Sequence, residues 1–100
     1  MKIVYDISKY TPEEAYIKIN SLLDGLVSQY SNMISNPTKK WNDEKNKMDF
    51  GFDVSEFNIH GNIKLQGKEL IVNGKLPWIA RIYNGKVKDI VKEQLEELFP

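Results

Sequence analysis

Two kinds of hydrophobic periodicity divide the chain into predicted strands and predicted helices. Alternation of apolar and polar residues, which is typical of a half-buried strand, occurs in four segments, at 2–7, 48–54, 57–65 and 70–75. Residues 38–42, centred on Trp41, form a further short candidate strand. Apolar residues at helical spacing cover 12–33 and 76–98. The predicted order of elements is therefore β-α-β-β-β-β-α.

The first predicted helix has clear signals at both ends. Thr11 can accept a hydrogen bond as the N-cap residue, Pro12 suits the first helical position, and Glu14 completes a capping box. Asn36-Pro37 ends the helical segment and predicts a turn. Gly25 lowers the stability of this helix by about 1 kcal/mol relative to Ala. A glycine at such a position indicates that the helix and the sheet come close together there.

The three strands between residues 48 and 75 are joined by short turns, which predicts an antiparallel meander. Strands with one apolar face and one polar face need cover on the apolar side only. The two amphipathic helices supply that cover. The sequence therefore predicts one α+β domain over residues 1–100, with an antiparallel sheet of four to five strands and both helices on one face. The polar face is either solvated or a binding surface.

Composition narrows the functional classes. Lys plus Arg and Asp plus Glu number 14 each, so the formal net charge is zero and favours neither nucleic acid nor anionic membrane. A charge near zero also does little to prevent self-association, and we expect a homodimer. The chain has no cysteine, no apparent signal peptide and no apolar run of about 20 residues that would span a bilayer. These features favour a cytoplasmic location.

Candidate catalytic chemistry centres on His60, the only histidine. Asp49 and Asp53 are expected on the same sheet face, where they could form an acid/base pair or a metal site with it. The alternative is a solvent-exposed histidine on a strand. No motif of nucleophilic catalysis, dinucleotide binding or phosphate binding occurs. We therefore assign no catalytic residue, metal or cofactor and predict that the protein is not an enzyme.

Aromatic residues are the other candidates for interaction. Trp41 lies among Lys39, Lys40, Lys45 and Lys47, a combination that can bind single-stranded nucleic acid. Acidic residues nearby largely cancel this charge, so we predict no nucleic-acid binding, and Trp41 can instead pack inward.

Trp78 lies at the start of the last predicted helix and Phe99 near its end, where each could anchor a partner or pack in the core. The candidate interaction residues are thus Trp41, His60, Trp78 and Phe99.

The second half of the chain carries a familiar series of features: Trp41, Phe50 and Phe52, Ile59 to Ile63 with its central glycine, Gly67, Leu76-Pro77 and the helix at 86–98. In this order they resemble the polyhydroxyalkanoic acid system family, small bacterial proteins associated with polyester-granule genes. The resemblance implies association with polyhydroxyalkanoate granules or their metabolism, and with the granule surface or another protein as partner. It brings no catalytic residues.

Two functions follow as hypotheses. The first is a non-enzymatic interaction or adaptor protein, by resemblance at polyhydroxyalkanoate granules. The alternative is a carrier of a small apolar ligand, a lipid or hydroxyacyl compound. A curved sheet closed by a long helix can leave a cavity lined by Phe, Tyr and Ile, whereas a tightly filled core would exclude the carrier.

Overall fold

The computed structural model describes residues 1–75 and 84–100. Its elements in chain order are β1 (Lys2–Asp6), α1 (Pro12–Asn20), α2 (Leu22–Gln29), β2 (Ile34–Trp41), β3 (Lys47–Val54), β4 (Phe57–Gln66), β5 (Glu69–Lys75) and α3 (Asn84–Leu98). The predicted α+β class and the order β-α-β-β-β-β-α are confirmed, with α1 and α2 together forming the first predicted helix. The predicted start of the last helix, at Leu76-Pro77, and the candidate Trp78 lie outside the described residues.

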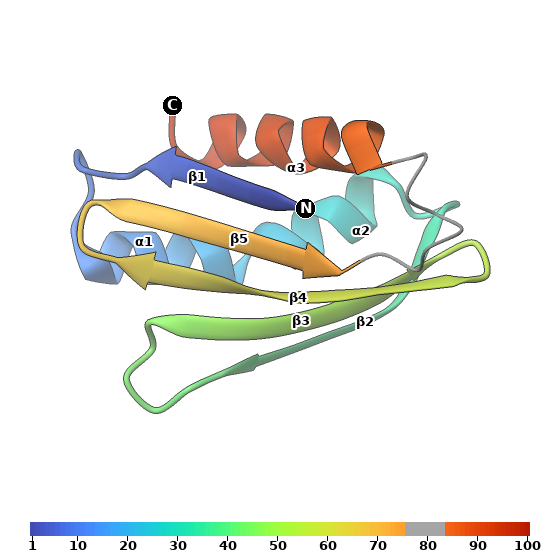
Figure 1. Ribbon diagram of the computed structural model, residues 1–100, viewed down its shortest axis with the longest axis horizontal. Helices are drawn as coiled ribbons and strands as arrows, with labels where there is room; N and C mark the ends of the chain where they lie inside the picture. The colour runs from blue at the N-terminus through green and yellow to red at the C-terminus, as the bar shows by residue number, and fades with distance from the viewer. Residues whose placement is uncertain (76–83) are drawn as a thin grey trace.

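All five strands form one antiparallel sheet in the spatial order β1-β5-β4-β3-β2 (Figure 1). Strands β3 to β5 make the predicted meander, β2 extends it by pairing with β3, and β1 pairs with β5 at the opposite edge of the sheet. Helices α1 and α2 therefore carry the chain from one edge of the sheet to the other. The register aligns one apolar row across the sheet, formed by Ile3, Val72, Ile63, Met48 and Trp41.

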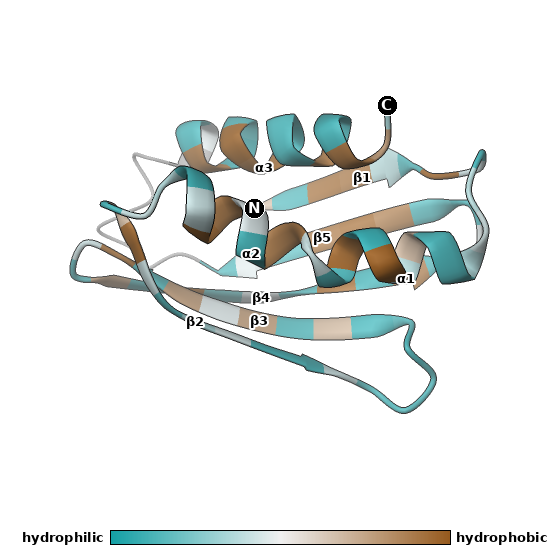
Figure 2. Ribbon diagram, turned by 180° about the vertical axis from the view of Figure 1, so that it is seen from behind, coloured by the Kyte–Doolittle hydropathy of each residue, from teal (hydrophilic) through white to brown (hydrophobic). Residues whose placement is uncertain are grey.

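Helices α1, α2 and α3 cover the same face of the sheet, and each has hydrophobic stretches alternating with hydrophilic ones (Figure 2). Their most buried residues are Ala15 and Ile19 in α1, Leu22, Leu23 and Leu26 in α2, and Val91 and Leu95 in α3. These pack with the inward side chains of the strands into one hydrophobic cluster. Within the described ranges, no helix is both long enough and apolar enough to cross a membrane.

The first helix begins as predicted but is divided in two. Thr11 Oγ1 accepts from the Glu14 backbone N–H at 3.1 Å, and Glu14 accepts from the Thr11 N–H at 2.9 Å, which completes the capping box. The division falls at Ser21, whose hydroxyl donates to the Lys18 carbonyl at 2.8 Å. A serine that bonds its own backbone competes with regular helix hydrogen bonds. Helix α2 then ends at Gln29, earlier than the predicted end near residue 33.

Strand β2 begins before the predicted turn and runs through it. Asn36 has a φ of +53°, and the register shifts between Ser35 and Thr38, so two residues of β2 face one of β3. This is a β-bulge rather than a turn. Because β2 lies at the edge of the sheet, Pro37 can occupy the bulge without removing a hydrogen bond from a central ladder.

Two glycines lie where neighbouring elements approach each other closely. Gly61 of β4 pairs with Gly74 of β5, and a Cβ atom at Gly61 would lie 1.9 Å from the Asn73 carbonyl oxygen. Gly25 approaches the side chain of Gln94 on α3, since a Cβ there would lie 3.2 Å from Gln94 Oε1. The expected close contact at Gly25 is therefore between two helices and not between helix and sheet.

Candidate functional site

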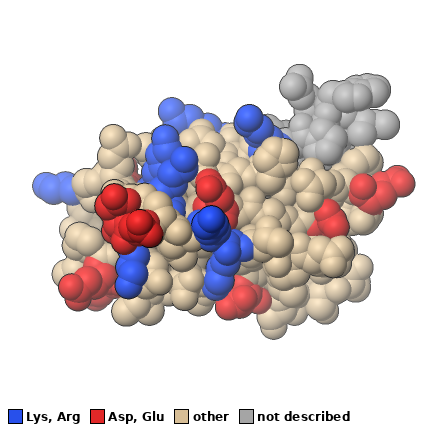
Figure 3. All heavy atoms as spheres, turned by 90° about the horizontal axis from the view of Figure 1, so that it is seen from below, with Lys and Arg blue, Asp and Glu red and all other residues tan. Residues whose placement is uncertain are grey.

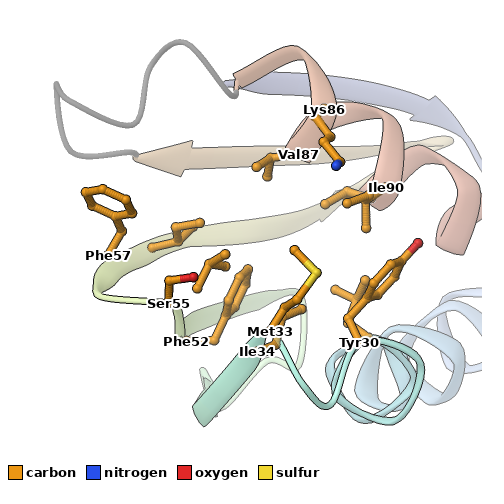
Figure 4. Close-up of a pocket in the computed structure, with 13 residues that line it drawn as sticks. Tyr30, Met33, Ile34, Phe52, Ser55, Phe57, Lys86, Val87 and Ile90 are labelled. Carbon is orange, nitrogen blue, oxygen red and sulfur yellow. The ribbon is translucent and has the colours of Figure 1, made fainter.

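An apolar cavity of about 260 Å³ lies between α2, the beginning of α3 and one end of strands β2 to β4 (Figure 4). The residues that line it are aliphatic or aromatic, except for Ser55 and Lys86. Tyr30 contributes an aromatic ring and a hydroxyl group. The cavity has the composition of a small-molecule site, with mostly apolar walls and a few polar groups.

The β3–β4 hairpin supplies one wall of the cavity. Val54 pairs with Phe57 across the hairpin, and both residues line the cavity. The turn between them is only two residues long, and Ser55 adopts a φ of +55° to make it. The Ser55 N–H donates to the Met33 carbonyl at 3.2 Å, which ties the hairpin to the segment between α2 and β2.

The end of α2 supplies the opposite wall. The carbonyl oxygen of Tyr30 accepts from the N–H groups of Met33 and Ile34, at 2.9 and 2.8 Å, so the chain turns sharply from α2 into β2. This turn brings the side chains of all three residues to the cavity. Met33 is 41% exposed, an unusual value for a large apolar residue, and it lies where the cavity meets the surface.

Helix α3 closes the cavity through Val87, Ile90 and Val91. Figure 4 shows Val87 and Ile90 directed from α3 towards Met33 and Tyr30, with the Lys86 side chain extending beside them. Lys86 is exposed and Val87 is half-buried, as expected at the edge of the apolar stripe of a helix. Lys86 is the only charged residue among those described that line the cavity.

Trp41, a candidate interaction residue, contacts α1. Its Nε1–H donates to Asn20 Oδ1 at 3.0 Å, and its ring lies 4.7 Å from that of Tyr16. The neighbouring Lys39 donates to the Asn20 carbonyl at 2.6 Å, and Lys45 lies over the Tyr16 ring at 5.3 Å. The segment around Trp41 therefore packs against α1. This arrangement corresponds to the alternative in which Trp41 packs inward.

Phe99, another candidate, is 4% exposed and lies beside β1, at the opposite edge of the sheet from Trp41. Its ring packs edge-on against Tyr10, with 5.1 Å between centroids, and lies 6.1 Å from the ring of Tyr5. The Tyr5 hydroxyl donates to the Phe99 carbonyl at 3.1 Å. Desolvation, together with the charge of Glu96, raises the pKa of Tyr5. Phe99 thus closes the core at this edge.

His60 lies on the open face, where it ends a chain of polar side chains. The amide groups of Asn36 and Asn58 donate to Asp53 at 2.9 and 3.0 Å. Because the Asn58 amide nitrogen is donating, its oxygen is the acceptor 3.3 Å from His60 Nδ1. Asp49 shares this face through its pairing with Asn62. Among the described residues, no group of three or more His, Cys, Asp or Glu side chains is placed to hold a metal ion.

The pKa of Asp53 is held below its usual value by the hydrogen bonds from Asn36 and then Asn58, since both stabilise the carboxylate. We expect Asn36→Gly to raise the Asp53 pKa towards that of an ordinary aspartate. Glycine also accepts the positive φ of this position, so the backbone stays unstrained. The measurement is an NMR titration of the side-chain carboxyl groups.

Asp6 is the internal control for this titration, because the Ser8 N–H lowers its pKa at a separate site. A folded-state pKa below the unfolded value means that the Asp53 contribution to stability is present above the unfolded pKa. That contribution is lost as the pH falls through the folded pKa. An unchanged Asp53 titration in Asn36→Gly would contradict this account.

Charges do not gather by sign on the face seen in Figure 3, where Lys side chains lie among Asp and Glu side chains. Within residues 1–75 and 84–100, the one ion pair joins Lys39 to Asp24 at 3.7 Å. Proteins that bind nucleic acid rely on clustered positive charge to neutralise phosphates. This face does not present such a cluster among its described residues.

The residues singled out from the sequence do not form one site. Trp41 and Phe99 lie at opposite edges of the sheet and His60 lies on the open face, while Trp78 is outside the described residues. Their roles in interaction stay predictions. The cavity residues Tyr30 and Lys86 were not identified from the sequence. Comparison with protein-family models, with curated proteins and with solved structures gave no match.

Proposed function

We propose that the protein is a non-enzymatic carrier that binds a small apolar ligand in the cavity between α2, α3 and β2–β4. The observation that supports this proposal is a cavity of about 260 Å³ with almost entirely apolar walls. An engineered apolar cavity of about 150 Å³ binds benzene, so by proportion this one holds roughly ten non-hydrogen atoms. The ligand is therefore the size of a medium-length alkyl chain.

Unfilled space of this size is costly for a small domain. The cavity opens to the surface beside Met33, so its apolar walls contact water instead of other protein atoms and do not gain the stabilisation that burial provides. A chain of 100 residues has a limited core with which to offset that cost. A ligand that fills the cavity restores the contacts, and its binding stabilises the folded state by mass action.

Straight-chain alcohols test this function without introducing charge. We expect hexanol, octanol, decanol and dodecanol to displace a bound hydrophobic fluorophore, N-phenyl-1-naphthylamine, and to raise the melting temperature. Each added methylene group should tighten binding by about three- to fourfold, because it is transferred from water to the apolar walls. The gain should level off near ten carbon atoms, when the cavity is full.

Val87→Phe should abolish this displacement, because Val87 points into the cavity and a larger ring would occupy the ligand's place. The matched control is Val4→Phe, the same substitution at a residue that is 51% exposed on β1 and away from the cavity. Equal binding by Val87→Phe and Val4→Phe, or no dependence on chain length, would exclude the cavity as the binding site.

Association with polyester granules is the second candidate function. The favouring observation is the exposed Met33 beside the cavity, because alkyl side chains at a polymer surface could enter by the route that a free alkyl ligand uses. The protein should then adsorb to polyhydroxyalkanoate particles, and decanol should release it. If decanol does not release the adsorbed protein, granule binding does not use the cavity.

A further inference from the structure

The polar groups around the cavity are unequally placed, and this asymmetry indicates how a ligand is oriented. Lys86 is the single charged residue of the described lining, and it lies at the first turn of α3. Ser55 and Tyr30 contribute hydroxyl groups from separate elements on other sides of the cavity (Figure 4). A ligand in the cavity therefore meets one positive charge and otherwise mostly hydrocarbon.

Lys86 is well placed to meet the head of a ligand rather than its tail. Its side chain is exposed, so the ammonium group keeps its contact with water while the aliphatic stem passes beside Val87 and Ile90. Within the described residues no carboxylate lies within 4.0 Å of Lys86, although Asp89 is one helical turn away. Its charge is therefore available to an anion at the mouth of the cavity.

Resting on the function proposed above, we propose that the ligand is an aliphatic monocarboxylate of medium chain length, with its carboxylate at Lys86 and its alkyl chain in the cavity. One lysine balances one negative charge. A dianionic phosphate head would leave a charge without a partner beside Met33 and the apolar walls, at a cost in desolvation. The volume sets the alkyl chain inside the cavity at roughly ten carbon atoms.

Three ligands of equal length and different charge test this assignment: decanoate, decanol and decylamine, each used below its micelle-forming concentration. The unmodified protein should bind decanoate about five- to tenfold more tightly than decanol, because a partly exposed ion pair adds a modest increment to burial of the chain. Decylamine should bind most weakly. Decyl phosphate serves as the dianionic comparison and should bind less tightly than decanoate.

Lys86→Glu should reverse the order, so that decylamine binds more tightly than decanoate, with decanol nearly unchanged. The matched control is Lys92→Glu, which makes the same change of charge at an exposed position of α3 that does not line the cavity. Lys92→Glu should keep the original order. Circular dichroism and thermal unfolding establish that both variants fold.

The outcomes separate this inference from the function on which it rests. Decanol binding with no preference for decanoate, or the same order of ligands in Lys86→Glu, would overturn the carboxylate assignment and leave the apolar carrier in place. Tighter binding of decyl phosphate than of decanoate would overturn the choice of head group. Failure of all four compounds to displace the fluorophore would overturn the carrier function itself.

Discussion

Gly61→Ala should remove a large fraction of the stability of the folded protein. The added Cβ would lie 1.9 Å from the carbonyl oxygen of Asn73 and 2.8 Å from the Cα of Gly74. Both are backbone atoms of β5, so no side chain can rotate away to make room. Relief requires that β4 and β5 separate, and β5 also holds β1 in the sheet. We expect a loss of about 3 kcal/mol or more in the free energy of unfolding, a large fraction of the roughly 5–15 kcal/mol that stabilises a typical domain.

Urea unfolding followed by circular dichroism measures this loss, with Gly85→Ala as the control. No atom lies within 4 Å of the position that a Cβ would take at Gly85, which is exposed near the start of α3. There the same substitution should be neutral or stabilise by roughly 0.5–1 kcal/mol, because alanine restricts the unfolded chain and favours the helix. Similar unfolding midpoints for the two variants would show that β4 and β5 can accommodate a side chain at their closest approach.

Ile19→Ala is the second change with a large expected effect. Ile19 is 0% exposed and belongs to the central hydrophobic cluster, where α1 packs against the sheet. Truncation removes buried methyl and methylene groups and leaves a void, which typically costs about 2–5 kcal/mol. Thermal and urea unfolding should both show the loss. The ellipticity at 25 °C should still be that of a folded protein if the cost is at the lower end of this range.

The control for this substitution lies two residues away on the same helix. Ile17 is 67% exposed, so Ile17→Ala removes little buried surface and also improves helix propensity. Its unfolding free energy should stay within about 0.5 kcal/mol of the original value. If both isoleucine variants lost the same stability, the orientation of α1 on the sheet would be wrong.

The strands and the covered face could be predicted from the sequence because one-sided burial leaves a period of two. Residues 48–54 alternate between apolar and polar types, and the structure turns Met48 and Phe52 inward and leaves Asp49 exposed. Local signals were less informative at Ser21 and at Asn36-Pro37. A serine such as Ser21 can lie inside a helix or interrupt it. The pair Asn36-Pro37 suits either a turn or a bulge. Only pairing with β3 determines that Asn36-Pro37 is a bulge.

The cavity could not be located from the sequence for a different reason. Val87 and Val91 are both valines on the apolar stripe of α3, and both line the cavity. Their exposure nevertheless differs, since Val91 is buried and Val87 is half-buried. The sequence pattern does not distinguish these two environments. What separates a filled core from a cavity is the distance to the opposite element, and hydrophobic periodicity carries no information about that distance. The carrier hypothesis anticipated a lining of Phe, Tyr and Ile, but not its position or the part played by Lys86.

The position of β1 has a consequence for the order in which the chain folds. The hairpins from β2 to β5 join segments that are adjacent in the sequence, so the meander can form from local contacts. Among the described strands, β1 is synthesised before the others and its partner β5 after them. Closing this long loop is entropically slow, and until it closes β5 has an unprotected edge. We therefore expect the docking of β1 to be the slow step of refolding and partly folded chains to aggregate before it is complete.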